Sequence, residues 1–257
     1  MLASLVASGF VGIAGLNWYL GRAPSKSDDQ RRFEADNRTC IRSDSAEAQL
    51  AACSRLIASG WLEERGQAKV YNNRGVAHWR LDRFDLALAD YERSLAINPD
   101  DADTHVNKGN AHVFRNEHTA ALVSYGQAAM IDRTHPSVHR NMGNALWEIG
   151  EFPAALNAYA QAISATPQES TPYYLRGGWL MEMKRWREAV ADFDAILRLE
   201  PREPRALAYR AVCWEQLGDS VRAAADHSAA RAIDPDVAEA SRKRALNPPA
   251  HNRSPAR

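Results

Sequence analysis

Asparagine side chains recur in this chain at a fixed step of 34 residues, and their chemistry suits the binding of peptide backbone. Each amide carries a hydrogen-bond donor and an acceptor on one rigid head. A row of such heads can therefore bond an extended peptide, whatever its side chains are. The amides could instead bond one another, water or a neighbouring helix backbone. The row consists of Asn73, Asn107 and Asn141, then Asn110 and Asn144, with Asn72 beside the first.

Two cysteines stand close together near the N-terminal end. Cys40 and Cys53 are 13 residues apart, and a disulfide between them would be worth about 3 kcal/mol in the chain-entropy model. The alternative is two small buried thiols. Cys213 would be the odd cysteine, and we expect it to be reduced and buried in a helix.

Histidines offer no clear metal site. His135 and His139 are four residues apart, a spacing that can place two ligands on one helix face. Pro136 lies between them, however, and the histidines fall at positions where side chains pack between helices. We therefore expect no metal and no cofactor.

Catalytic and nucleic-acid-binding signatures are missing from the sequence. It has no glycine-rich phosphate loop, no G-x-S-x-G or H-E-x-x-H motif and no paired C-x-x-C. Basic and acidic residues both number 32, so the formal net charge is zero, whereas nucleic-acid-binding domains usually show a basic excess. We expect neither an enzyme nor a partner made of nucleic acid.

The asparagine spacing belongs to a wider repeat of 34 residues, which carries two apolar-periodic helical stretches in each unit. A fixed period of this length predicts an all-α solenoid whose units pack only on their neighbours. Prolines fall where each unit must turn. The repeated positions hold small residues, aromatic residues and these prolines: Gly75, Gly109, Gly143 and Gly177; Ala87, Ala121, Ala155, Ala189 and Ala223; Tyr91, Tyr125, Tyr159 and Phe193; Pro99, Pro167, Pro201 and Pro235.

This pattern resembles the tetratricopeptide repeat (TPR) family. The resemblance implies a right-handed superhelical solenoid of antiparallel helix pairs, with five units at 68–101, 102–135, 136–169, 170–203 and 204–237. Unit position 7 departs from the family's leucine, and we expect its arginine stems to pack while their charged heads reach water. The residues at position 7 are Arg74, Lys108, Met142, Arg176 and Arg210.

The resemblance also implies a binding surface, because in this family the first helix of each unit lines a concave groove. Positions 2, 5, 6, 9, 12 and 13 line that groove. The amide row ends at Leu175, so we expect the peptide to bind the first three units. The aromatic members could instead pack against the next unit. The candidate groove residues are Asn72, Asn73, Trp79, Asn107, Asn110, Phe114, Arg140, Asn141, Asn144 and Trp147.

One specialised version of this groove is not expected. The chaperone-binding members of the family use a carboxylate clamp with lysine at position 5 and arginine at position 6. Here position 5 is Asn72, Val106 and Arg140, and no arginine occupies position 6. We therefore expect no chaperone-tail carboxylate clamp.

The flanks of the repeats suggest a membrane tether. Residues 2–20 carry no charge and approach the ~20 residues that a spanning helix needs. We assign 1–22 as an uncleaved anchor, with a signal peptide as the alternative. The basic residues that follow favour repeats on the cytoplasmic face of the inner membrane, whereas a Cys40–Cys53 bond would need an oxidising compartment such as the periplasm. Of the two, we expect the periplasm.

The remaining segments complete the expected organisation. Residues 23–67 are a linker and a partial N-terminal helical cap with a helix at 46–59, 238–246 form a closing helix, and 247–257 form a disordered basic tail. The sequence thus predicts an interaction scaffold that binds an extended segment of a partner protein in its concave groove. The alternative is a structural assembly factor of a bacterial envelope complex, acting through its convex face or by self-association.

Overall fold

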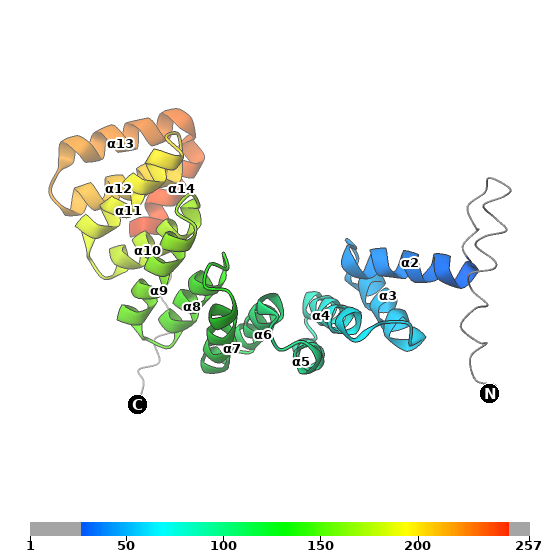
Figure 1. The fold of residues 1–257 in the computed structure, drawn as a ribbon. Helices are drawn as coiled ribbons and strands as arrows, with labels where there is room; N and C mark the ends of the chain where they lie inside the picture. Colours follow the sequence, from blue (N-terminus) through cyan, green and yellow to red (C-terminus); the bar gives the residue numbers. More distant parts are fainter. Residues whose placement is uncertain (1–26, 247–257) are drawn as a thin grey trace, which may run out of the picture. The chain divides into compact units, whose positions relative to one another are not determined.

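The structure, a computed structural model, describes residues 27–246. In this part the chain forms 13 α-helices and no strand (Figure 1). The expected anchor at 1–22 and the expected tail at 247–257 lie outside the described residues. Between residues 27 and 246, none of the helices has the length and hydrophobicity that a membrane span requires. The helices fall into two compact units, which divide between Asn98 and Pro99.

The first unit contains two helix pairs, and one of its helices was not expected. Helix α3 covers the predicted 46–59, but the segment before it is also helical, although we expected a linker there. This helix, α2, begins with a capping box, in which the Ser27 hydroxyl and the Gln30 side chain each accept a bond from the other residue's backbone N–H. The helices are α2 (Asp28–Ile41), α3 (Ala46–Ser59), α4 (Glu64–Arg80) and α5 (Phe84–Ile97).

A disulfide and an arginine hold α2 and α3 in place. Cys40 and Cys53 are joined, with their Cα atoms 4.9 Å apart, and both are fully buried. Arg80 of α4 donates to the backbone oxygen of Ser43 at 2.9 Å and to that of Asp44 at 2.5 Å. Arg80 thus fastens the α2–α3 turn to the first repeat.

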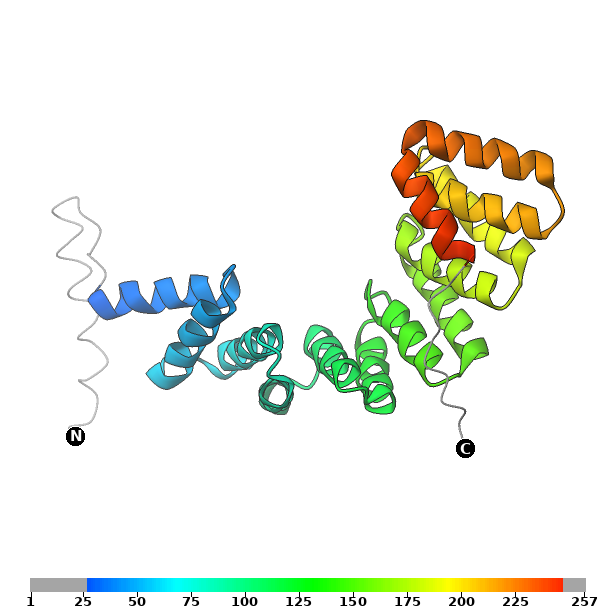
Figure 2. The same cartoon turned by 180° about the vertical axis from the view of Figure 1, so that it is seen from behind.

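The second unit contains four helix pairs and a closing helix. Each pair falls in one predicted repeat, and the closing helix begins at Pro235, three residues before the predicted 238. It packs on α12 and α13 (Figure 2). The helices are α6 (Ala102–Phe114), α7 (His118–Ile131), α8 (Val138–Glu148), α9 (Phe152–Ala165), α10 (Ser170–Glu182), α11 (Trp186–Leu199), α12 (Pro204–Gln216), α13 (Ser220–Ile233) and α14 (Pro235–Leu246).

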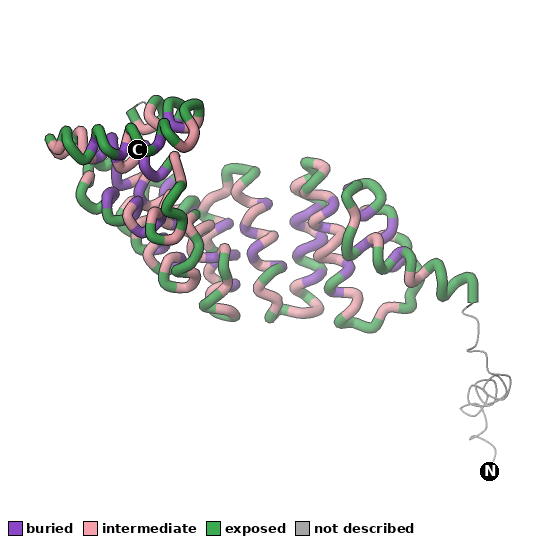
Figure 3. Tube along the Cα trace, turned by 90° about the horizontal axis from the view of Figure 1, so that it is seen from above, coloured by how far each residue is buried: buried purple, intermediate pink, exposed green. Residues whose placement is uncertain are grey.

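The core of each pair depends on a glycine and an aromatic ring. A Cβ atom added to Gly75 would lie 2.6 Å from Cε1 of Tyr91, closer than packed atoms allow. Tyr91 is 1% exposed, and the same contact recurs at Gly109 and Gly143, and less tightly at Gly177, where the ring is Phe193 at 3.1 Å. Buried residues are accordingly spread along every pair rather than gathered in one centre (Figure 3), as expected where repeats bury surface only against neighbours.

The arginines at position 7 are mostly buried, and their charged heads pair with carboxylates, which we did not expect. Arg74 donates to both carboxylate oxygens of Asp90, each at 2.7 Å, and the Asp90 side chain is 2% exposed. Since a buried carboxylate must be paired, position 7 serves the packing of the two helices. The same pairing joins Arg176 to Asp192 and Arg210 to Asp226.

Candidate functional site

Some amide groups of the asparagine row in the second unit form hydrogen bonds within the protein. Asn110 on α6 accepts through Oδ1 from the Tyr125 hydroxyl at 2.8 Å and from Nδ2 of Asn141 on α8 at 3.0 Å. Burial raises the pKa of Tyr125, so its hydroxyl stays protonated and donates. The row therefore includes an amide–amide bond, one of the alternatives raised by the sequence.

Asn144, the other asparagine at position 9, bonds a tyrosine in the same way. The Asn144 oxygen accepts from the Tyr159 hydroxyl at 2.7 Å, and that hydroxyl accepts from Nε1 of Trp179 at 3.0 Å. In the described part of the chain, Nδ2 of Asn110 and Nδ2 of Asn144 have no protein acceptor. Each of these amides thus stabilises a buried tyrosine through its oxygen and keeps N–H donors for another molecule.

The candidate aromatics divide into one buried and one exposed residue in this unit. Trp147 is only 5% exposed and stacks on Trp179, with the ring centroids 4.0 Å apart. Trp147 thus packs against the next repeat, which was the alternative interpretation of the aromatic candidates. Its ring is not available to a ligand. Phe114 is 57% exposed, and Arg140 is half-buried on α8. Phe114 and Arg140 remain candidates beside the amides.

The candidates in the first unit all lie on α4. Asn72, Asn73 and Trp79 are each half-buried. Their neighbour Arg80 is occupied by the α2–α3 turn. The candidates of the first unit are thus two adjacent amides and one indole on a single helix.

No metal centre is present among residues 27–246, where no three acidic, histidine or cysteine side chains are grouped to hold an ion. His135 is bonded through Nε2 to Oδ1 of Asp103 at 3.0 Å. His139 is bonded through Nε2 to the Arg133 backbone oxygen, also at 3.0 Å. The two rings thus have separate structural partners.

A cavity of about 930 Å³ lies farther along the second unit, between α10, α12 and α14. Five of the residues that α10 contributes stand at positions 5, 6, 9, 12 and 13, which are positions assigned to the groove. The sequence prediction missed this cavity because it followed asparagines, and here position 6 holds Leu175 and Tyr209. The α10 residues at those positions are Tyr174, Leu175, Gly178, Met181 and Glu182.

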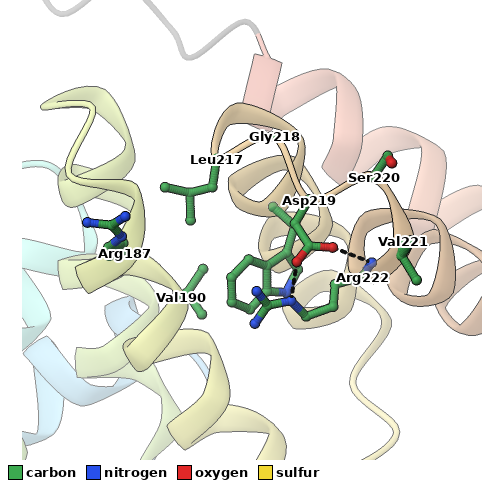
Figure 4. Close-up of a pocket in the computed structure, with 9 residues that line it drawn as sticks. Arg187, Val190, Leu217, Gly218, Asp219, Ser220, Val221 and Arg222 are labelled. Atoms are coloured by element: carbon green, nitrogen blue, oxygen red, sulfur yellow. Dashed lines mark hydrogen bonds and ion pairs between the residues drawn. The ribbon is translucent and has the colours of Figure 1, made fainter.

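A second, smaller cavity of about 560 Å³ adjoins the α12–α13 turn (Figure 4). The Arg222 guanidinium lies 3.7 Å from the ring centroid of Trp214, and its Nε donates to Asp219 at 2.6 Å. Figure 4 shows Asp219 and Arg222 joined by dashed lines beside the other lining residues. The charge of Arg222 is thus already paired within the protein.

Family models of the tetratricopeptide repeat match residues 68–101, 140–182 and 180–238. The chain belongs to the tetratricopeptide repeat family. Its TPR units 68–101, 170–203 and 204–237 lie within the matched residues. A comparison with curated protein sequences found no match.

Solved TPR structures share the fold at low sequence identity. The C-terminal part of a TPR repeat-containing protein from Cytophaga hutchinsonii is 18% identical, with a TM-score of 0.69, and covers 85% of this chain and 96% of its own. MamA is 21% identical, with a TM-score of 0.59, and covers 67% and 94%. YrrB, described as a TPR protein with an unusual peptide-binding site, is 20% identical, with a TM-score of 0.58, and covers 75% and 98%.

The positions of the second unit that the sequence assigns to the groove therefore carry two kinds of surface. On α6 and α8 they present Asn110 and Asn144, whose N–H groups remain available, together with an exposed phenylalanine. On α10 and α12 they present an aromatic cavity. Protein backbone suits the first surface, and apolar side chains suit the second.

Proposed function

We propose that this TPR protein is an interaction scaffold, not an enzyme, which holds an extended segment of a partner protein on the concave positions of α6 and α8. The observation that carries the proposal is the pair of position-9 amides, Asn110 and Asn144. Their oxygens bond buried tyrosines, which fixes the heads and leaves each N–H group to donate to a peptide carbonyl. Fixed donors bind with a smaller entropy cost than mobile ones.

The proposal is tested with Asn107→Ala and Asn141→Ala combined. These residues are preferred because the Tyr125 and Tyr159 hydroxyls donate to Asn110 and Asn144, so alanine at either of those two would leave a tyrosine hydroxyl without its acceptor. A photo-crosslinker placed at Phe114 would capture the partner, which mass spectrometry would identify. The binding affinity of that partner for the double variant should fall by at least about tenfold, the effect of roughly 1.4 kcal/mol.

A matched control is available on the opposite helix of the third repeat. Asn157 is exposed on α9, so Asn157→Ala changes an amide outside the groove and should leave the affinity unchanged. Unaltered affinity in the double variant would contradict the groove proposal.

A second candidate function is the assembly factor, which is supported by exposed apolar residues on α7. Val123 is 64% exposed and Met130 is 77% exposed, and seven residues apart they share one helix face. The two functions are separated by comparing the sedimentation coefficient of the unaltered protein with that of a double variant, Val123→Glu and Met130→Glu. A self-associating scaffold would become monomeric in the double variant, whereas a peptide-binding scaffold would keep its sedimentation coefficient.

We also propose that the repeats lie in an oxidising compartment such as the periplasm. The Cys40–Cys53 disulfide supports this location, since such bonds rarely persist in the cytosol. Labelling of thiols in intact cells, with and without reductant, tests it. Reaction of Cys40 and Cys53 without reductant would contradict it, and would favour the cytoplasmic face of the inner membrane. The anchor at residues 2–20 remains a prediction.

A further inference from the structure

The concave positions change character after α8. At position 6, Asn107 and Asn141 are followed by Leu175 and Tyr209, and at position 9, Asn144 is followed by Gly178. The amides thus give way to apolar and aromatic side chains at the point where the 930 Å³ cavity opens.

The cavity owes its space to a glycine and its walls to aromatic rings. A Cβ atom built on Gly178 would meet nothing within 4 Å, so this helical glycine leaves the floor open. Tyr174 and Tyr209 form one wall, with ring centroids 6.4 Å apart and nearly perpendicular. Trp179 and Trp186 also line the cavity, and α14 closes it with Val237, Ala240, Ala245 and Leu246.

The charged groups at the cavity are mostly positive. Lys184, Arg205 and Arg244 line it, and Glu182 is the one acidic residue that does so. Arg205 is engaged, since its Nε donates to Glu203 at 2.9 Å and its guanidinium lies 5.2 Å from the ring centroid of Tyr174. Within residues 27–246, neither Lys184 nor Arg244 has an acidic partner, and both are exposed.

We propose that this cavity is an anchor site for a partner segment in which an aromatic residue is flanked by acidic residues. The anchor ring would lie over Gly178 against the wall formed by Tyr174 and Tyr209, and the flanking carboxylates would meet Lys184 and Arg244. A buried aromatic anchor supplies affinity, and opposite charges at the rim supply orientation and association rate. The inference rests on the proposed function, because it names the partner's chemistry and extends the groove beyond α8.

The chain's own tail is a less suitable occupant. Leu246 lines the cavity and the tail follows it directly, but residues 247–257 contain Arg253 and Arg257 and no acidic residue. Like charges would therefore face each other across the rim. An acidic segment of another protein matches the charge of the site.

The probes are three dye-labelled peptides of equal length, whose binding to the full chain is followed by fluorescence polarisation. The first has a central phenylalanine flanked by glutamates, the second has alanine in place of phenylalanine, and the third has lysines in place of glutamates. The first should bind at least about tenfold more tightly than the second, and the third should not bind. Raising NaCl from about 0.1 to about 1 M should weaken the first, since screening shortens to a few ångströms.

Variants at Gly178 assign that binding to the cavity. Gly178→Leu fills the floor without a clash at Cβ and should abolish binding, while Gly178→Ala, a matched control for helix propensity, should reduce it only slightly. Gly126 on α7 is also a helical glycine with open space, so Gly126→Leu repeats the substitution away from the site and should leave binding unchanged. Circular dichroism would show that all three variants fold.

Charge variants test whether the exposed basic residues at the cavity contribute to peptide binding. Arg244→Gln should weaken binding of the glutamate peptide by about tenfold or less. Lys243→Gln, one residue away and not at the cavity, should not weaken it.

Several outcomes would overturn the anchor site. The first is that the glutamate–phenylalanine peptide fails to bind at about 1 mM. The others are that the Gly178→Leu variant binds it as tightly as the unaltered protein does, or that the protein prefers the lysine peptide. Much tighter peptide binding after truncation at Leu246 would instead assign the cavity to the chain's own tail. If Asn107→Ala with Asn141→Ala weakens the natural partner while Gly178→Leu does not, the groove proposal stands and the anchor site falls.

Discussion

Arg176 on α10 and Asp192 on α11 form a two-point ion pair across the fourth repeat, with Nε–Oδ2 and Nη2–Oδ1 distances of 3.0 and 2.6 Å. The Asp192 side chain is only 3% exposed. The third repeat replaces this pair with Met142 and Ala158 at the same two positions. The fold therefore accepts an ion pair or an apolar pair here, but the partners must match.

Breaking the pair at one end should be costly. Asp192→Ala leaves Arg176, whose side chain is 26% exposed, without its carboxylate. Loss of one partner of a buried pair typically costs about 3 kcal/mol, and partial exposure of Arg176 lowers this toward about 2 kcal/mol. Urea denaturation followed by circular dichroism would measure the change in the free energy of unfolding.

The apolar pair of the third repeat supplies the control. Arg176→Met combined with Asp192→Ala copies Met142 and Ala158, and should recover most of the stability lost in the single variant. Glu188→Ala, which removes the exposed partner of Arg185, should cost less than about 1 kcal/mol. A double variant no more stable than Asp192→Ala would contradict this account.

Alanine at a position-8 glycine should destabilise the protein despite its better helix propensity. A Cβ on Gly143 would lie 2.6 Å from Cε1 of the buried Tyr159, and overpacking of this kind costs about 1–3 kcal/mol. Gly126→Ala should instead add about 0.5–1 kcal/mol, because nothing lies within 4 Å of its Cβ position. Thermal denaturation of both variants checks the opposite signs, and two stabilised proteins would show that Tyr159 can move aside.

The repeat was sufficient to predict the helix pairs, since each position's residue type follows from a contact inside the unit. Helix α2 escaped because its sequence has few apolar residues, although Ser27 and Gln30 carry the spacing of a capping box. The ion pairs were also visible in principle. Arginine at position 7 and aspartate at position 23 occur together in three repeats. From the sequence we considered position 7 without position 23, so we did not identify the aspartate partner.

The site was less accessible from the sequence. Asparagine types and spacing located the amides, but the tyrosine bonds that consume Asn110 and Asn144 oxygens depend on how the helices pair. Trp147 illustrates the same limit, because only the position of Trp179 decides that it is buried. The cavity depends on α14 lying near α10, and on the side chain that Gly178 lacks.

Lys184 occupies a backbone conformation that glycine prefers. Its φ is 58°, and the corresponding turns of the third and fifth repeats use Gly150 and Gly218, at φ 85° and 80°. A side chain in this region costs about 1 kcal/mol or more, partly offset by the greater freedom of glycine in the unfolded chain. Lys184→Gly should therefore raise the free energy of unfolding by about 0.5 kcal/mol, measured in urea.

The same variant would separate stability from binding. If the anchor site is correct, Lys184→Gly should weaken binding of the glutamate–phenylalanine peptide while the protein becomes more stable. Asn116→Gly, at the equivalent turn of the second repeat with φ 59°, should change stability less, because asparagine tolerates this conformation. Loss of stability in Lys184→Gly would contradict the assignment of strain.

Cys213 should react with alkylating reagents only when the fifth repeat opens. Its thiol is fully buried, and burial raises its pKa to about 12, so the reactive thiolate is scarce at pH 8. Iodoacetamide should modify the native protein at least about 100-fold more slowly than the protein in urea. Mass spectrometry should find one modified cysteine in urea alone, because Cys40 and Cys53 are bonded, and all three of the chain's cysteines after reductant is added. Equal rates in the native and unfolded protein would place the Cys213 thiol in contact with solvent, and three modified cysteines without reductant would show that the disulfide does not form.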